Sequence, residues 1–308
     1  MTKTRAILRQ SVTALAANKG RSLLTVLGII IGIASVITLV SLGAGVQVSI
    51  AGEITALGAN HLMIMPGMQM GGGPGGNGFM GRGPGDGGGV PGGASSLTAE
   101  DLAILEDRGR FPEIELVSAQ ISGSGVFTTR EGDRRYPVVG TSPALFSMQG
   151  LRAEAGVIFD QRDLENISRV AVLGHQIASD IYGAGGINAA IGSTIPIAGS
   201  QYRVVGVLAP AAESMLANPN AQVFIPHPAA AQDFGVSNFN LITVRVATAA
   251  AVEPVRQEIT SALLDRRGIT DERLADFGVS SSADLLTLVN TITGTLTALL
   301  AAIAGISL

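Results

Sequence analysis

The sequence predicts an α+β fold: an extracytoplasmic, mixed α/β domain flanked by two transmembrane helices with stalk extensions, which anchor it to a membrane. Three observations predict this fold. Two stretches without charged residues lie near the two ends of the 308-residue chain. Between them, strand-like segments come in hairpin-like runs rather than in strict alternation with helices, which is typical of α+β domains. Only 14% of the residues are charged, against about 25% in ordinary soluble domains.

The first uncharged stretch is long enough to cross a bilayer. Residues 23–46 include fourteen Leu, Ile or Val residues among 24, and a helix of about 20 residues spans the hydrocarbon core. The alternative is a secretory signal peptide, whose apolar part is usually about 7–15 residues long. We expect transmembrane helix 1 at residues 23–46.

Charge sets the expected orientation of this helix. The first 47 residues hold five basic residues and no acid, which places the N-terminus in the cytoplasm by the positive-inside rule. Lys19 and Arg21, next to the apolar stretch, are the residues that we expect to determine topology. Apolar residues at helical spacing predict an interfacial cytoplasmic helix at 1–22, and a frayed basic tail is the alternative. Residues 47–283 are then extracytoplasmic.

A glycine-rich segment interrupts the outer domain soon after it begins. Residues 61–65 resemble a strand that Pro66 ends, and residues 67–93 then contain fifteen glycines. The run at 83–88 formally satisfies G-x-G-x-x-G, but Pro84 lies inside it and no helix follows. We therefore expect a flexible loop at 67–96 rather than a nucleotide site.

Ordered structure is expected to resume at Thr98. Thr98 and Asp101 have the spacing of a capping box, which predicts a helix through about Arg108. Further helices are expected at 176–182 and 252–266. The expected strands are 116–121, 125–129, 138–141, 170–173, 194–197, 202–208, 222–225 and 241–246.

No chemistry-bearing motif stands out in this domain. The chain has no cysteine, no phosphate-binding G-x-x-x-x-G-K-[ST] loop and no G-x-S-x-G nucleophile elbow. His61, His175 and His227 are far apart and lack ligand-like spacing. The acids at 100–101 and 106–107 are explained by helix starts and solvated faces. We expect no catalytic, cofactor-binding or metal site, and no ATPase within this chain.

The charge of the main body argues against nucleic acid as a partner. After residue 47 the chain carries 24 acids against 15 arginines, a net charge of −9. Nucleic-acid binding needs a basic footprint instead.

The second uncharged stretch runs to the end of the chain. Ser281 to Asp284 resemble a helix start, and residues 285–308 carry no charge. Threonines and Asn290 on one side indicate that the first turns form a stalk. No basic flank follows, so residues 284–308 are expected to be a stalk and a truncated transmembrane helix 2.

Small residues recur four positions apart in both apolar stretches. Gly28 and Gly32 form a G-x-x-x-G pair, and Gly294, Ala298 and Ala302 share one face. Because small faces permit close backbone approach in lipid, these faces are predicted to pack against each other or against a second copy. Chance occurrence in a chain rich in alanine and glycine is the alternative.

Several segments in order resemble one known family. These segments are NKGRSLLTVLGIIIG at 18–32, GEITALGAN at 52–60, VVGTSP at 138–143, AVLG at 171–174 and YRVVGVL at 202–208. Each is weak alone, but their order and spacing are similar to MacB-type (FtsX-like) ABC transporter permeases. The resemblance covers essentially the whole chain.

The resemblance implies a permease of the cell (inner, cytoplasmic) membrane that forms a homodimer or permease pair. It implies four membrane helices per chain, a large periplasmic core domain between the first two, and a cytoplasmic ABC ATPase, fused or separate. Stalk helices would carry ATP-driven motion to the outer domain, and a periplasmic adaptor completes the pathway in related systems. Helices three and four have no counterpart in these 308 residues, so a truncated permease is expected.

Two other functions remain open at the level of the sequence. One is a membrane-anchored binding or sensing domain without ATP coupling. The other is a secreted enzyme released by signal cleavage, for which no motif was found.

Overall fold

The computed structural model describes residues 60–67, 97–183, 185–213 and 218–284, with scattered helical positions between 20 and 45 and between 287 and 299. The chain divides into two compact units: residues 53–285, here called the core domain, and residues 1–52 together with 286–308. The predicted interfacial helix and the glycine-rich loop lie outside the described residues, apart from Gly20 and Gly67.

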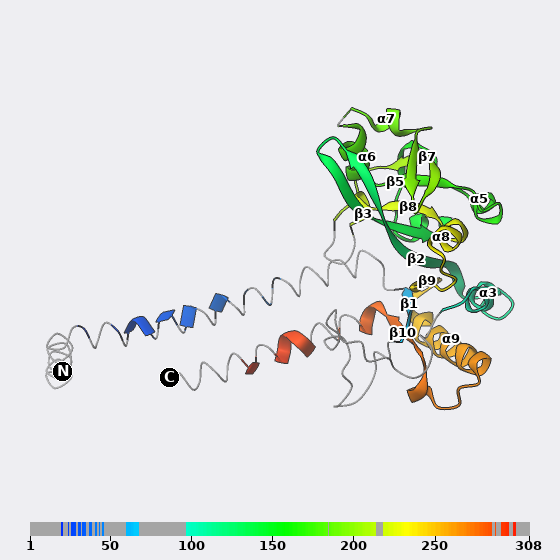
Figure 1. Cartoon of the computed structure of the whole chain (residues 1–308). Helices are drawn as coiled ribbons and strands as arrows, with labels where there is room; N and C mark the ends of the chain where they lie inside the picture. The colour runs from blue at the N-terminus through cyan, green and yellow to red at the C-terminus, as the bar shows by residue number, and fades with distance from the viewer. Residues whose placement is uncertain are drawn as a thin grey trace, which may run out of the picture. The chain divides into compact units, whose positions relative to one another are not determined.

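The core domain begins and ends in the same antiparallel sheet, whose strand order is β10-β1-β9-β2 (Figure 1). In chain order the elements are β1 (His61–Pro66), α3 (Ala99–Glu106), β2 (Ile114–Thr129), β9 (Leu241–Val246), α9 (Val252–Arg267) and β10 (Phe277–Ser281). Strand–helix–strand therefore occurs twice, in a split βαβ arrangement with the last strand beside the first. All other strands and α-helices of the described core domain are inserted between β2 and β9.

The insertion extends the sheet in the order β3-β8-β5-β7-β4, with β6 paired to β7. Its strands are β3 (Gly132–Thr141), β4 (Ala153–Gly156), β5 (Val170–Leu173), β6 (Thr194–Ile197), β7 (Ser200–Leu208) and β8 (Val223–Pro226). Its helices are α4 (Pro143–Met148), α5 (Gln161–Glu165), α6 (His175–Tyr182), α7 (Ile187–Ala190) and α8 (His227–Phe234). Short 3₁₀ turns are η1 (Pro219–Ala221), η2 (Ala249–Ala251) and η3 (Glu272–Leu274).

Strand β2 joins the two halves of the domain. Its first part pairs with β9 as far as Gln120, and from Ile121 onward it pairs with β3. We expected two strands here, separated near two glycines, and that expectation was wrong. A Cβ at Gly123 would lie 2.5 Å from the ring of Phe234, so this glycine allows α8 to pack against an unbroken strand.

One large hydrophobic cluster runs through both halves. It includes Leu62 of β1, Ile121 of β2, Tyr202 of β7 and Ile259 of α9, all fully buried. A second, smaller buried cluster around Phe146, Phe159 and Phe224 lies within the insertion. The core domain is thus stabilised by a large apolar interior shared by both halves and by this smaller one.

The alternating and strongly apolar strands were predicted best. The bounds of β5, β6 and β9 are those expected. Helix α3 starts at the predicted capping box but ends at Glu106 rather than Arg108, because Asp107 adopts an extended conformation with ψ 97°. Six helices and strands were not expected from the sequence, which are α4, α5, α7, α8, β4 and β10.

Most of the predicted transmembrane segments 23–46 and 284–308 lies outside the described residues. Among the positions that are described, none belongs to a helix with the length and apolar character needed for a bilayer crossing.

Candidate functional site

The two ends of the core domain meet in one strand pair. Strand β1 is antiparallel to β10, with Leu62 opposite Ser281 and Pro66 opposite Phe277. The residue at which the chain enters β1 is therefore beside the residue at which it leaves β10, on strands about 4.8 Å apart. Figure 1 shows β1 and β10 side by side. We call this strand pair, residues 61–66 with residues 277–281, the junction.

Local sequence explains strand β1. Leu62 and Ile64 are fully buried, whereas Met63 is partly exposed, as the two-residue period of a strand requires. Gly67, which follows Pro66, has φ +68°, a left-handed conformation that glycine adopts without strain. Its backbone N–H donates to the carbonyl oxygen of Asp276 at 2.6 Å. The turn after β1 is thereby tied to the residue before β10.

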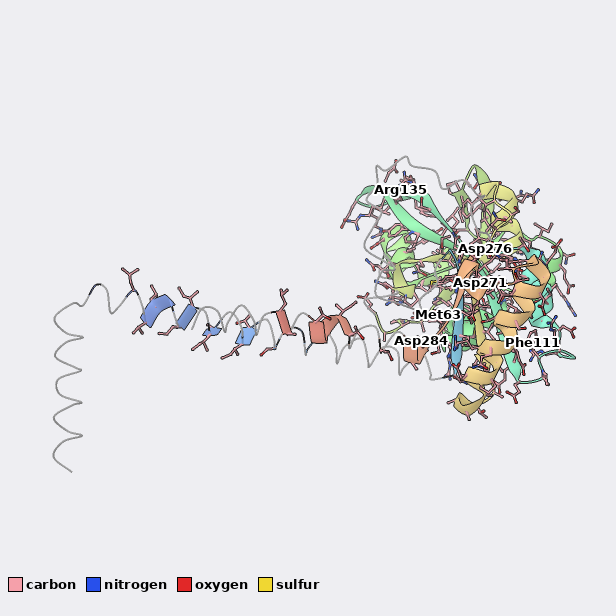
Figure 2. All side chains as sticks on the ribbon, turned by 90° about the horizontal axis from the view of Figure 1, so that it is seen from below. Met63, Phe111, Arg135, Asp271, Asp276 and Asp284 are labelled. Carbon is pink, nitrogen blue, oxygen red and sulfur yellow. The ribbon has the colours of Figure 1, made fainter. Side chains whose placement is uncertain are left out.

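A helix begins at the last residue of β10. The Ser281 N–H and Oγ both donate to Asp284 Oδ2, at 2.8 and 2.9 Å, and the Asp284 N–H donates to Ser281 Oγ at 3.2 Å. This is a capping box, and residues 282–284 are helical, as the sequence predicted. Figure 2 labels Asp276 and Asp284, which lie before and after β10. No linker separates strand and helix here.

A buried carboxylate stabilises the other side of the junction. Asp101 is fully buried at the start of α3, where its Oδ2 accepts from the Thr98 N–H at 2.8 Å. Arg266 Nη1 donates to Asp101 Oδ1 at 2.6 Å, and Arg267 Nη2 donates to Asp101 Oδ2 at 2.9 Å. Two guanidinium groups at the end of α9 thus neutralise one carboxylate at the beginning of α3.

Arg267 extends this network to β10. Its Nη1 also donates to Asp276 Oδ1, and its guanidinium carbon lies 4.9 Å from the ring centroid of Phe277. Ion pairing and cation–π contact both hold that side chain in place. A displacement of β10 is therefore opposed by α9 and, through Asp101, by α3.

Sequence analysis was wrong about Asp101. We attributed the acids at 100–101 to the helix dipole and to water, which holds only for the capping contact. Asp101 instead lies in a buried ion-pair network with residues 165 and 166 positions away. No local pattern indicates a partner at that distance. The two adjacent arginines at the end of a predicted helix were the one available signal.

The predicted helix-packing residues are only partly described, so their packing stays a prediction. Gly28 and Gly294 are described, and a Cβ at either would have no atom within 4 Å. Ala298 is exposed, and Lys19, Arg21, Gly32 and Ala302 lie outside the described residues. A Cβ at Gly43, by contrast, would lie 3.6 Å from Thr293 Cγ2. The two terminal segments thus approach each other at a pair that the sequence did not indicate.

The histidines lie in three different settings. His61 is buried in β1, His175 Nδ1 lies 2.9 Å from Glu154 Oε2, and His227 packs edge-on against Phe239. Within the part of the chain that the structure describes, no group of three or more His, Asp or Glu side chains is placed to hold a metal ion.

Comparison with protein families gives a match over most of the chain. A model of the MacB-like periplasmic core domain matches residues 22–262. The chain belongs to the MacB-like permease family. This assignment confirms the resemblance that the sequence segments carried.

Curated MacB relatives match nearly all of the chain. A macrolide export ATP-binding/permease protein MacB from Neisseria meningitidis serogroup A is 30% identical over 301 residues, which cover 97% of this chain and 42% of that protein. The protein of the same name from Bradyrhizobium diazoefficiens is 31% identical over 305 residues, which cover 99% and 43%. This MacB-like chain therefore spans less than half the length of these relatives.

Solved structures confirm the mixed α/β fold of the MacB-like chain. The periplasmic region of MacB from Actinobacillus actinomycetemcomitans superposes with a TM-score of 0.58 at 18% identity, covering 78% of this chain and 97% of that one. The extracellular domain of the noncanonic ABC-type transporter YknZ from Gram-positive bacteria gives a TM-score of 0.53 at 18% identity, covering 72% and 100%.

Proposed function

We propose that this chain forms part of the permease of an ABC-type exporter. ATP-driven motion of the two stalk helices that flank the core domain would move that domain. Residues 23–46 and 284–308 would cross the membrane, with the N-terminus in the cytoplasm and the core domain outside. The hydrolysis of ATP would belong to an ATPase, fused or separate, that these 308 residues do not include. A second permease copy and a periplasmic adaptor are the other partners that the family suggests.

The junction is the observation that carries this proposal. Both segments that connect the core domain to the terminal segments attach at the same end of two hydrogen-bonded strands. A movement of the segment after Asp284 is transmitted without a linker, because the capping box joins that helix directly to β10. The Asp101 network then couples β10 to α9 and α3. An anchored binding domain without ATP coupling has no need for such a connection.

A reversible crosslink between the terminal segments tests the proposal. The chain has no cysteine, so Gly43→Cys with Thr293→Cys introduces a single pair whose side chains are close enough to form a disulfide. We expect oxidation to abolish ATP-dependent export by the assembled transporter in membrane vesicles, and reduction to restore it. Gly28→Cys with Thr293→Cys is the matched control, because a Cβ at Gly28 has no atom within 4 Å.

Two results decide the test. Loss of export only in the oxidised Gly43→Cys/Thr293→Cys protein supports stalk-driven transport. Unchanged export after complete crosslinking contradicts it, as does a core domain that is protected from protease added outside intact cells.

A further inference from the structure

A cleft of about 630 Å³ lies within the core domain, distinct from the junction. Residues of α3, β2, α4, α5 and α8 line it, so both the first half of the domain and the insertion contribute. A volume of this size is within the usual range for small-molecule sites, about 300–1,000 Å³.

Aromatic side chains of a buried cluster are packed into the apolar wall of the cleft. Phe146 and Phe159 line it, each 2% exposed, and their ring centroids lie 5.4 Å apart in an edge-to-face arrangement. Phe224 supports Phe146 from behind, with centroids 5.3 Å apart. These rings are packed and almost fully covered, so they fix the wall rather than receive a ligand. An apolar ligand would contact the partly exposed Pro143, Ile158 and Pro228, which also line the cleft, without rearranging the core.

The charged groups of the cleft all have the same sign. Glu106, Asp160 and Glu165 line it, and no lysine or arginine does. Asp160 caps α5 by accepting from the Arg162 and Asp163 N–H groups. Within the described part of the chain, Glu106 and Glu165 make no hydrogen bond or ion pair. Burial raises the pKa of the Glu106 carboxyl, a shift that the nearby Arg108 opposes and that a bound cation would also oppose.

His227 adds a polar group without adding positive charge. It lines the cleft, and burial lowers its pKa to about 4, so its imidazole is neutral at pH 7. The imidazole makes no hydrogen bond within the described residues, although its ring packs at 5.4 Å from that of Phe239. A neutral imidazole can donate or accept a hydrogen bond without repelling a cation.

We propose that this cleft binds a small amphiphilic amine, with its ammonium group beside Glu106 and Glu165. Its apolar body would lie on the partly exposed Pro143, Ile158 and Pro228. Shape and apolar lining favour a compact hydrophobic body, and the carboxylates that line the cleft select a positive end. An anionic amphiphile would face three carboxylates. The inference does not rest on ATP-driven transport, because every residue that it uses belongs to the core domain.

A tryptophan reporter measures binding directly, since the chain has no tryptophan of its own. Ile158→Trp places one in the lining of the cleft, and Val157→Trp places one on the neighbouring residue, which is 64% exposed and outside the cleft. The full chain in phosphatidylcholine nanodiscs is titrated with 4,4-diphenylbutylamine, with the matched alcohol 4,4-diphenylbutan-1-ol and with the matched carboxylate 4,4-diphenylbutanoate.

We expect the amine to change the fluorescence of Ile158→Trp in a saturable manner and to leave that of Val157→Trp unchanged apart from partitioning into lipid. Glu106→Gln with Glu165→Gln, in the Ile158→Trp background, should weaken amine binding roughly fivefold and leave binding of the alcohol unchanged. Both glutamates are exposed at the rim, so this variant should keep its fold, which circular dichroism checks.

Amide hydrogen exchange of the chain without tryptophan supplies a second measurement, with protection by the amine expected across α4 and α5. The proposal is overturned if the carboxylate or the alcohol binds as tightly as the amine. It is equally overturned if the two glutamate substitutions leave amine affinity unchanged, or if the two tryptophan reporters respond alike.

Discussion

Two adjacent acids at the start of α3 differ sharply in environment. Asp101 is fully buried between Arg266 and Arg267, whereas the Glu100 side chain is 79% exposed and forms an ion pair with Arg266. Removing one partner of a buried ion pair costs about 3–5 kcal/mol, because the remaining charges stay buried. Exposed pairs contribute less than about 1 kcal/mol. Position along the chain thus says little about the energetic role of an acid.

We predict that Asp101→Asn lowers the free energy of unfolding by about 3–5 kcal/mol, measured by denaturant titration. Glu100→Gln is the matched control and should cost less than about 1 kcal/mol. Equal losses in the two variants would mean that the buried network does not stabilise the junction.

Ile167 is a β-branched residue in a left-handed conformation, with φ 51°. It follows α5, where the Ser168 N–H donates to the Asp163 carbonyl at 2.8 Å, a position at which glycine is favoured. We predict that Ile167→Gly raises the free energy of unfolding by about 1 kcal/mol. Glycine has no Cβ, so it avoids the steric cost that a Cβ causes in the left-handed conformation. Ile167→Ala retains that Cβ, so a similar gain in the alanine variant would refute this explanation.

Burial of His227 makes stability depend on pH. Its pKa is about 4 in the folded protein, against an ordinary 6.5. Between these values the unfolded chain binds a proton that the folded chain does not, so stability falls as pH drops from 6.5 to 4. We predict that His227→Gln removes up to about 1.4 kcal/mol per pH unit of this decline. Denaturant titrations at several pH values measure it, and parallel curves for both proteins would contradict the prediction.

At the scale of elements, the junction depends on the continuity between β10 and the following helix. Ser281 is both the last residue of the strand and the cap of the helix, because Asp284 reaches back to it. A capping box satisfies backbone groups that would otherwise lack partners at the helix start. Strand and helix therefore share their boundary residue.

We predict that Asp284→Ala lowers the free energy of unfolding by about 1 kcal/mol and speeds amide exchange at residues 281–284. Asp284→Asn keeps an oxygen acceptor at the same place and should retain most of the stability. If alanine and asparagine behave alike, the side-chain acceptor does not hold this boundary.

Elements with a strong local signal were predictable, and those determined by distant contacts were not. Strand β9 alternates Ile242, Val244 and Val246 on its buried face, a pattern readable without any structure. Strand β10 contains two buried serines and a glycine beside Phe277 and Val279, so its composition favours a strand only weakly. Its pairing with β1, more than 200 residues earlier in the sequence, creates it.

The same distinction applies at the scale of the whole molecule. The family was evident from weak segments in the right order, because those segments are spread over most of the chain, as is the family match at residues 22–262. The cleft and the Asp101 network were not evident, because each brings together side chains from elements far apart in sequence. The topology of the fold determines which distant side chains come into contact. It follows from long-range strand pairing rather than from local propensity.

The central claim is that the junction moves as one body with the core domain when ATP acts on the assembled transporter. Pulsed electron paramagnetic resonance tests it with spin labels at Ala283→Cys and Ser261→Cys, in a chain that has no other cysteine. Diluting labelled with unlabelled subunits separates distances within one chain from distances between two copies. We predict that ATP changes the distance between the Ala283→Cys positions of two copies and leaves the 283-to-261 distance within one chain unchanged. An ATP-dependent change in the 283-to-261 distance, or no change between the copies, would contradict the account.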